Sequence, residues 1–375
     1  MDAELVRLLS EADRALGRLD GATSVLPNPD LFVAMYVRQE AVYSSQIEGT
    51  QSTLEDVLDF EAEGKAREHS HDVEEVVNYV RAMNYGLKRL PGLPLSLRLI
   101  KEIHAELMHE VRGQAKTPGE FRKTQNWIGP HGCLLKDAEF VPPPVAEMKT
   151  SLANLERFLH DTTSLPPLMH CGVAHAQFET IHPFLDGNGR VGRLLIAFLL
   201  CQRQILSQPL LYLSHFLKAH RNTYYDKLTE VRVSGNWEGW LKFFLTGVST
   251  VSEEAASTAR SILNLQEEHR RLIRRKVSSA TNAMVLLDFM FRAPVFTIRM
   301  AERDLGCAYV TARNLVEDFE KIGLVREVTG GQRNRRYHYD PYLKLFKEPS
   351  HSASHCSHFK TAKQGAGIRS LFQNS

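Results

Sequence analysis

One segment constrains the fold of this chain more than any other. Residues 182–193 read His-Pro-Phe-Leu-Asp-Gly-Asn-Gly-Arg-Val-Gly-Arg, and the apolar run 194–200 follows directly. Because Pro183 cannot continue the helix predicted before it, a second, buried helix must begin at about Asn188. The glycines then lie at a helix N-terminus, where unpaired backbone N–H groups and the helix dipole attract anions. The segment therefore predicts a phosphate-binding loop between two helices.

The side chains of this segment suit the same chemistry. Asp186 is a single carboxylate beside the expected phosphates, which is how proteins usually hold Mg²⁺. His182 is largely neutral at pH 7 and can take a proton from a hydroxyl. Arg190 and Arg193 are three residues apart, so both guanidinium groups are expected to point at one polyphosphate. Phe184 is the predicted anchor of the loop. The alternative, a structural loop with salt bridges, requires six ordered glycine and polar positions to coincide by chance.

These residues resemble the motif of the Fic family, His-x-Phe-x-Asp/Glu-Gly-Asn-Gly-Arg-x-x-Arg, and every fixed position is matched. The resemblance implies transfer of the AMP part of ATP to a protein hydroxyl, with release of diphosphate. His182 would be the catalytic base and Asp186 the ligand of Mg²⁺. The related Doc-like toxins phosphorylate their targets and have a lysine in place of Gly189, so this chain favours nucleotidyl transfer. The nucleotide-binding residues implied by the motif are Gly187, Asn188, Gly189, Arg190, Val191, Gly192 and Arg193.

A second motif lies far upstream, where residues 43–50 read Tyr-Ser-Ser-Gln-Ile-Glu-Gly-Thr. Taken alone it is a helix that ends at Gly49, with Glu48 unfavourably placed for the helix dipole. The pattern Ser44-x-x-x-Glu48-Gly49 is similar to the inhibitory motif of Fic proteins. Carried over, Glu48 would bind Arg193 and occupy the place of the ATP γ-phosphate, which predicts an autoinhibited enzyme.

Helical periodicity predominates over residues 1–250, which predicts a mainly α fold. The resemblance implies that these helices form a Fic-type core. The expected helices are an acidic amphipathic one at the N-terminus and residues 34–46, 72–87, 97–111, 148–160 and 168–179, with another after the motif. Between 117 and 144, two short extended runs broken by Gly and Pro predict a β-hairpin. In Fic proteins such a flap docks the target's backbone by strand addition, and a packed structural loop is the alternative here. The candidate docking residues are Trp127, Ile128, Phe140, Val141 and Pro142.

Aromatic, histidine and cysteine side chains outside the two motifs are also candidates for a cofactor or metal site. Aromatic residues between 210 and 245 are more often core than part of a cofactor site. Tyr225 is assigned to the nucleotide through the resemblance alone, because the family has a paired tyrosine near the adenine. His170, Cys171 and His175 lack the spacing of a metal site, so we expect them to pack and cap within helices.

The C-terminal third changes character at residue 251, where a basic stretch to 276 predicts a helical connector. Helices at 283–291, 297–305 and 309–322, followed by two strands around Gly330-Gly331, resemble a small α+β winged-helix-like domain over residues 277–345. The wing arginines that can contact phosphates are Arg333, Arg335 and Arg336. The third helix also carries several acidic residues, so DNA binding and protein contact both stay open.

These assignments divide the rest of the chain into an N-terminal region, a catalytic core and a tail. Residues 1–90 are a helical region with the inhibitory motif, and residues 91–250 are the catalytic core. Residues 346–375 predict a disordered tail, in which the His and Cys residues are not expected to form a zinc site. Those residues are His351, His355, Cys356 and His358.

Composition excludes several other classes. The chain has 375 residues, 43% hydrophobic and 24% charged, which is ordinary for globular domains. A net charge of +2 provides no steering field, and five scattered cysteines indicate neither a disulfide framework nor a zinc ribbon. The first residues lack a signal-peptide pattern and the longest apolar run is too short to span a bilayer, so we expect a cytoplasmic protein.

Two functions are consistent with these motifs. The first is an autoinhibited protein adenylyltransferase that modifies a Ser, Thr or Tyr hydroxyl, with ATP as substrate and Mg²⁺ as cofactor. Its expected partners are a target protein, the chain itself as a site of self-modification, and a second copy in a homodimer, but no membrane. The alternative is a nucleotide-responsive DNA-binding regulator that acts through the winged helix.

Overall fold

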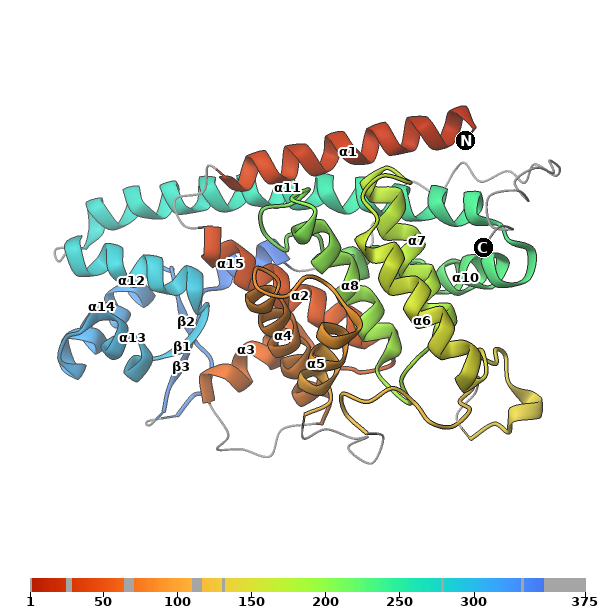
Figure 1. Cartoon of the computed structure of the whole chain (residues 1–375). Coiled ribbons are helices and arrows are strands. Elements are labelled where there is room, and N and C mark those ends of the chain that lie inside the picture. Colours follow the sequence, from red (N-terminus) through yellow and green to blue (C-terminus); the bar gives the residue numbers. More distant parts are fainter. Residues whose placement is uncertain are drawn as a thin grey trace.

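The computed structural model describes residues 2–24, 29–63, 71–109, 117–129, 132–277, 280–331 and 334–346. Arg333 and the predicted tail from residue 347 onward lie outside these ranges, as does the predicted helix end at residue 111. The expectation of a mainly α fold is confirmed, since helices make up most of the described chain (Figure 1). Among these helices, none combines the length and apolar character needed to cross a bilayer.

The helices predicted before the phosphate-binding loop are present, each within a few residues of its expected bounds. Their ends follow local signals: Ser96 caps α5 by accepting a hydrogen bond from the backbone of Leu99, and Pro167 occupies the first position of α7. The helices up to this loop are α1 (Ala3–Ser24), α2 (Pro29–Ile47), α3 (Leu54–Glu63), α4 (His71–Arg89), α5 (Leu97–Leu107), α6 (Val145–His160) and α7 (Pro167–Ile181), with the short 3-10 helix η2 (Leu135–Asp137) before α6.

Helix α8 (Asn188–Gln202) is the centre of the core. Its apolar run is buried on all sides, which explains why the run is continuous instead of periodic. α7 and α4 pack against it, and Gly86 permits the close approach of α4, because a Cβ there would overlap the ring of Phe198. The phosphate-binding loop therefore lies between two helices, α7 and α8, that are both largely buried.

A single long helix, α11 (Trp237–Lys276), runs along the molecule, and α1 packs against it (Figure 1). Two shorter helices, α9 (Leu213–Ala219) and α10 (Arg221–Ser234), precede it. The basic connector expected over 251–276 forms the second half of α11. The first half belongs to the core, where the indole N–H of Trp240 donates to the carbonyl of Gly172 at 2.8 Å.

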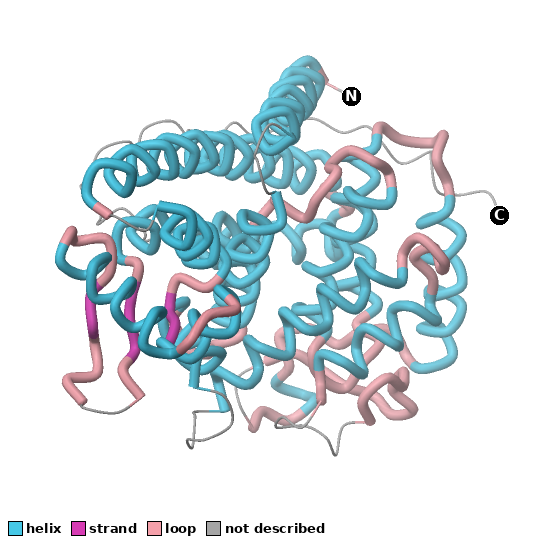
Figure 2. Tube along the Cα trace, turned by 90° about the vertical axis from the view of Figure 1, so that its left-hand side faces the viewer, coloured by secondary structure: helices cyan, strands magenta, loops and turns pink. Residues whose placement is uncertain are grey.

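The C-terminal residues form a small α+β unit. Its helices are α12 (Ala280–Arg292), α13 (Ile298–Leu305), α14 (Tyr309–Lys321), α15 (Asp340–Leu343) and the 3-10 helix η3 (Lys344–Phe346). The two predicted strands are β2 (Arg326–Glu327) and β3 (Arg336–His338), and an additional strand, β1 (Val295–Thr297), pairs with β3 in the antiparallel order β1-β3-β2. Figure 2 shows these strands together at one edge of the molecule.

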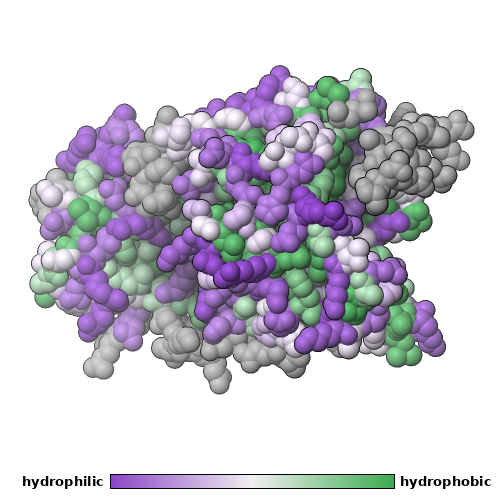
Figure 3. Space-filling view, in the orientation of Figure 1, coloured by the Kyte–Doolittle hydropathy of each residue, from purple (hydrophilic) through white to green (hydrophobic). Residues whose placement is uncertain are grey.

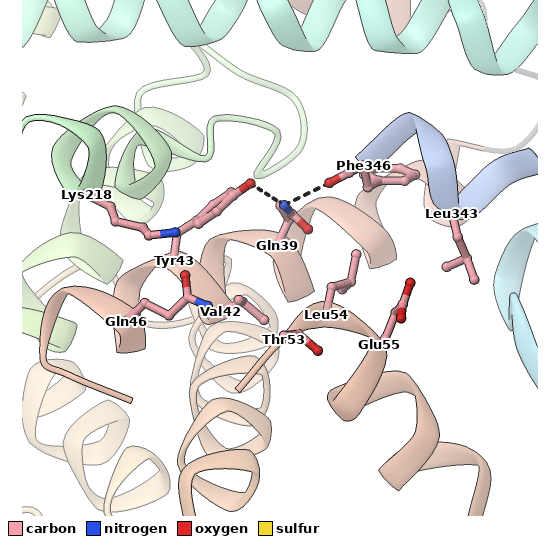
Figure 4. A pocket seen from close by; sticks show the side chains of 10 residues that line it. All are labelled: Gln39, Val42, Tyr43, Gln46, Thr53, Leu54, Glu55, Lys218, Leu343 and Phe346. Atoms are coloured by element: carbon pink, nitrogen blue, oxygen red, sulfur yellow. Dashed lines mark hydrogen bonds between the residues drawn. The ribbon is translucent and has the colours of Figure 1, made fainter. Parts of the chain in front are cut away.

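This unit packs on α2 and α3. Gln39 of α2 donates to the carbonyl of Phe346 at 3.2 Å, and Asp59 of α3 lies 3.4 Å from both Arg336 and His338. A cavity of about 370 Å³ lies at this junction (Figure 4). One face of α2 lines it through Gln39, Val42, Tyr43 and Gln46. The neighbouring face of α2 points to the phosphate-binding loop, so this helix contacts both parts of the chain.

Candidate active site

The loop between α7 and α8 begins at His182, whose backbone is left-handed, with φ of 48°. That conformation is costly for a residue with a Cβ and is typical of functional sites. Gly187 caps α8 with φ of 75°, and a Cβ there would lie 3.1 Å from the sulfur of Met108. Helix α8 begins at Asn188, as predicted.

Phe184 is fully buried and anchors the loop, as predicted. Its ring stacks on His104 of α5 with 3.7 Å between ring centroids. His104 accepts a hydrogen bond at Nδ1 from the backbone of Gly119, so its proton is on Nε2, which donates to the carbonyl of Asp186 at 3.0 Å. Burial lowers the pKa of His104 to about 4, which keeps the ring neutral. Sequence reasoning missed His104, whose only signal is a histidine within an apolar helix.

The side chain of Asn188 is hydrogen-bonded within the loop itself. Its Oδ1 accepts from the backbone N–H of Phe184 and its Nδ2 donates to the carbonyl of the same residue, both at 2.8 Å. Only 2% of Asn188 is exposed. The residue therefore shapes the loop, and what the start of α8 offers an anion is backbone N–H groups.

Glu48 reaches this helix start from the end of α2. Its Oε1 accepts from Nη2 of Arg193 at 2.7 Å, and Ser44 contributes Oγ at 2.8 Å and its carbonyl at 3.0 Å to the same guanidinium. Burial raises the pKa of the Glu48 carboxyl, but Arg193 outweighs this and lowers it below the ordinary value. A Cβ at Gly189 would overlap the Glu48 carboxylate, so this carboxylate lies directly over the glycines.

Arg190, the other arginine of the motif, is paired with carboxylates of the protein. Its Nη1 lies 3.0 Å from Glu75 of α4, and its Nη2 lies 3.9 Å from Asp186. The guanidinium is buried between α4 and α8. Glu75 was not predicted, because no local pattern links residues 115 positions apart.

The surroundings of His182 keep it neutral. Burial lowers its pKa to about 4, and the nearby cation of Arg232 adds to this effect. The Nη2 of Arg232 donates to the carbonyl of Glu179 at 3.1 Å, and its guanidinium lies 3.9 Å from the ring centre of Phe140. At pH 7 the imidazole can therefore accept a proton.

The expected flap is held against this loop by a buried arginine. Arg122 donates to the carbonyls of His182 at 3.1 Å, Thr124 at 3.2 Å and Pro143. The hairpin is reduced to one antiparallel bridge, between Ile128 and Phe140, within the described part of the segment. The run Pro142–Pro144 has no backbone N–H groups, which prevents a longer ladder.

Tyr225 lies at the edge of the site. Its ring is half-exposed, 5.1 Å from that of Tyr224, and the guanidinium of Arg221 lies 5.5 Å from the ring centre. Burial and then the Glu48 carboxylate raise the pKa of its hydroxyl. Tyr224 is core, and its hydroxyl lies 2.8 Å from Nε2 of His175.

The histidines near Cys171 act in packing. His175 Nδ1 lies 2.9 Å from the carbonyl of Gly192, and His170 Nε2 lies 2.7 Å from that of Phe158. In the described ranges, no three His, Cys, Asp or Glu side chains are grouped to hold a metal ion. Asp186 is a single, partly exposed carboxylate beside the helix start, a donor set that suits Mg²⁺ shared with phosphates.

Comparisons with known proteins agree with these observations. The Fic/DOC family N-terminal model matches residues 6–88, and the Fic/DOC family model matches residues 94–200. The chain is 31% identical over 170 residues to Protein adenylyltransferase Fic of Drosophila grimshawi, and 30% identical over 151 residues to the protein of that name from Culex quinquefasciatus. These matches cover 43% and 40% of this chain but 32% and 27% of the relatives, about a third of their length.

Two solved structures share the fold. A Fic family protein from Desulfovibrio desulfuricans G20 superimposes with a TM-score of 0.58 and 20% identity, over 90% of this chain and 96% of that one. A Fic domain containing signaling protein from Bacteroides thetaiotaomicron superimposes with a TM-score of 0.50 and 18% identity, over 68% of this chain and 95% of that one.

Proposed function

The chain belongs to the Fic/DOC family, and on this basis we propose that it is a protein adenylyltransferase restrained by its own helix α2. One observation carries the proposal: Glu48 binds Arg193 directly over the glycines at the start of α8, beside the neutral His182. Anion-binding backbone, a base and a removable carboxylate thus share one site.

In the proposed reaction, ATP binds with its phosphates at the N-terminus of α8. His182 takes the proton of a Ser, Thr or Tyr hydroxyl, and the hydroxyl oxygen attacks the α-phosphorus. The bond from the α-phosphorus to the oxygen that bridges to the β-phosphate breaks, and diphosphate leaves. Asp186 would hold Mg²⁺, which supplies positive charge that offsets the phosphate oxygens.

Restraint follows from competition for Arg193. While Glu48 occupies the guanidinium, the γ-phosphate loses a charge-assisted partner, and ATP settles with its α-phosphate poorly aligned to the attacking hydroxyl. Glu48 does not contact Arg190, which is paired with Glu75. The backbone N–H groups at the start of α8 can therefore still bind the nucleotide. The proposal therefore separates ATP binding from transfer.

The target would dock at the flap. Trp127, Ile128, Phe140, Val141 and Pro142 offer an extended backbone close to His182, and strand addition supplies main-chain hydrogen bonds without a requirement for one target sequence. Tyr225 would lie beside the adenine. Self-modification and a homodimer remain part of the proposal.

The experiment is label transfer from ATP labelled at the α-phosphate, with Glu48→Gly as the released enzyme. We expect label in protein, and loss of it in Glu48→Gly/His182→Ala by ~10²–10⁴ in rate with nearly unchanged ATP affinity. His215→Ala is the matched control, because His215 contacts Glu254 of α11 and the ring of Tyr43, and the Glu48→Gly background already removes the α2 restraint. Label that persists without His182 excludes its role as the base, and ATP affinity that falls as far as the rate assigns it to binding instead.

A DNA-binding regulator is the second candidate, favoured by one observation. Tyr309 and Val310, at the start of α14, are exposed, where a recognition helix would contact bases. Against it, Arg313 pairs with Glu317 at 3.1 Å and Lys321 with Asp318 at 2.8 Å, which reduces the positive charge available to phosphates. Salt-dependent binding of a fluorescent duplex that survives His182→Ala would favour this candidate.

A further inference from the structure

Exposed apolar side chains gather on the flap. Among the large apolar residues that stand exposed in the described ranges, four belong to the segment 117–144, namely Trp127 (41%), Leu134 (60%), Leu135 (45%) and Val141 (46%). Figure 3 shows apolar surface at the lower right edge of the molecule, where Figure 1 has this segment. Exposed apolar groups that gather in this way mark contact sites for a partner.

The position of this surface relative to the catalytic histidine is fixed. Arg122 joins the flap to the carbonyl of His182, and Asn126 donates to the carbonyls of Phe184 at 2.8 Å and His182 at 3.4 Å. The distance between a side chain on the flap and His182 is therefore fixed. Such a surface can select residues at set positions around a modified hydroxyl.

Side chains on the two sides of the flap have different surroundings. Asn126 points to the catalytic loop and Phe140 points to Arg232, so both lie on the inner face. Successive side chains of an extended chain alternate between faces. Trp127 and Val141, each next to an inner residue, therefore form the outer face, in agreement with their exposure.

The backbone of the same two residues points away from the hairpin. Ile128 and Phe140 exchange both backbone hydrogen bonds, at 2.8 and 3.2 Å, so the peptide groups of Trp127 and Val141 face outward. Within the described ranges, these two residues make no backbone–backbone hydrogen bond. These groups lie at opposite edges of the hairpin, so an added target segment would pair with the backbone of Trp127 or with that of Val141.

The side chains of an added target segment also alternate between the inner and the outer face. If its hydroxyl residue points inward to His182, its immediate neighbours in sequence point outward, beside Trp127 or Val141. We infer that the enzyme prefers hydroxyl residues in extended target segments whose adjacent residues, at −1 or +1, carry large apolar side chains. The inference rests on the proposed adenylyl transfer and flap docking, and adds the side-chain chemistry of the target.

The test uses the Glu48→Gly enzyme, ATP labelled at the α-phosphate and synthetic peptides with one central Ser, Thr or Tyr. Leu, Gly, Asp or Lys is placed at each position from −2 to +2 in turn. We expect Leu at −1 or +1 to give roughly two- to fivefold more label than Asp or Lys, as for one cross-strand pair. Positions −2 and +2, which face inward, should show no such gain.

A double variant, Trp127→Ser/Val141→Ser, should bring the ratio of Leu-flanked to Asp-flanked labelling to about one. The control is Val6→Ser, since Val6 is 51% exposed on α1, and it should leave the ratio unchanged. Equal labelling of all flanks, or a preference that survives the double variant, overturns the inference while leaving adenylyl transfer intact.

Two further outcomes of the peptide experiment also test the inference. If label enters only the enzyme itself, the modified residue is located by mass spectrometry, and the inference stands only if an apolar residue adjoins it. If neither peptide nor enzyme is labelled, short extended segments are not substrates and the inference falls, whereas adenylyl transfer to a target protein is decided by the label-transfer experiment above.

Discussion

Glu48 and Arg193 differ in exposure, and this difference decides which of them can leave. The side chain of Arg193 is 1% exposed and that of Glu48 is 38% exposed. Arg193 is also held by Ser44, so it stays in place when Glu48 withdraws. In the proposed enzyme, the guanidinium is therefore a permanent part of the site, and the carboxylate is the exchangeable partner.

Glu48→Gly should raise turnover by roughly ten- to a hundredfold, because a charge-assisted hydrogen bond passes to the γ-phosphate. The partial exposure of Glu48 favours the lower end of that range. Arg193→Ala should be inactive, and Glu48→Gly added to it should bring no recovery, since both changes act on one contact. The measurement is the rate of label transfer by the unaltered chain, Glu48→Gly, Arg193→Ala and the double variant. If the effects of the two changes on this rate are additive, turnover is controlled by another part of the chain.

In the proposed reaction, the acid limb of kcat/KM reports the protonation of His182. Its pKa is about 4, below the ordinary 6.5, so the neutral base and the activity persist as pH falls and are lost only near that lower value. Arg232→Gln removes a cation that lowers this pKa, so the limb should move to higher pH. Both proteins are compared in the Glu48→Gly background, because Glu48 itself raises the pKa of His182. Arg232→Lys keeps the cation and should keep the limb, whereas an unmoved limb in Arg232→Gln contradicts this account.

For single residues, the sequence predicted the features that depend on neighbours within one motif. The helix start at Asn188 and the anchor Phe184 follow from neighbouring residues, and Glu48 was paired with Arg193 through the resemblance. His104, Glu75 and other contacts from distant helices were missed, because no spacing along the chain records them. The side-chain partner of Asn188 was likewise not predicted, since it is set by how the loop closes.

Helices α4 and α8 pack closely, with no room for a methyl group at Gly86. Gly86→Ala in α4 should destabilise the protein by about 1–3 kcal/mol, because the new methyl group overlaps the buried ring of Phe198. The matched control is Gly17→Ala in α1, where a Cβ meets no atom within 4 Å. That change should stabilise by up to ~1 kcal/mol through helix propensity. Urea unfolding midpoints measure both, and equal shifts would show that α4 does not approach α8 as closely as described.

Helices with clear periodicity were predicted to within a few residues, whereas short elements were not. α3 and β1 were missed, and the flap hairpin has one bridge where two runs were expected, because pairing depends on partners far along the chain. β1 pairs with β3 across some forty residues, and nothing in its three-residue sequence requires a strand.

At the scale of the whole molecule, α11 runs from the core to the C-terminal unit, which α2 and α3 also contact. Ser257, exposed in its middle, is a position where a break should separate the two. Ser257→Pro should cost about 3 kcal/mol or more and split thermal unfolding into two transitions. Ser257→Ala keeps the helix and should unfold as the unaltered chain does. Scanning calorimetry distinguishes them, and one unchanged transition in Ser257→Pro would show that the halves are joined by other contacts.

Because α2 belongs to the same chain as the loop that it covers, the proposed restraint is a tethered one. A tethered group meets its site at an effective concentration in the millimolar range, whatever the amount of protein in the cell. Dilution or increased synthesis therefore cannot change the fraction of enzyme that is free to react. Only an event that moves the α2 end itself can do so, and the response per molecule should be the same in a cell that holds few copies as in one that holds many.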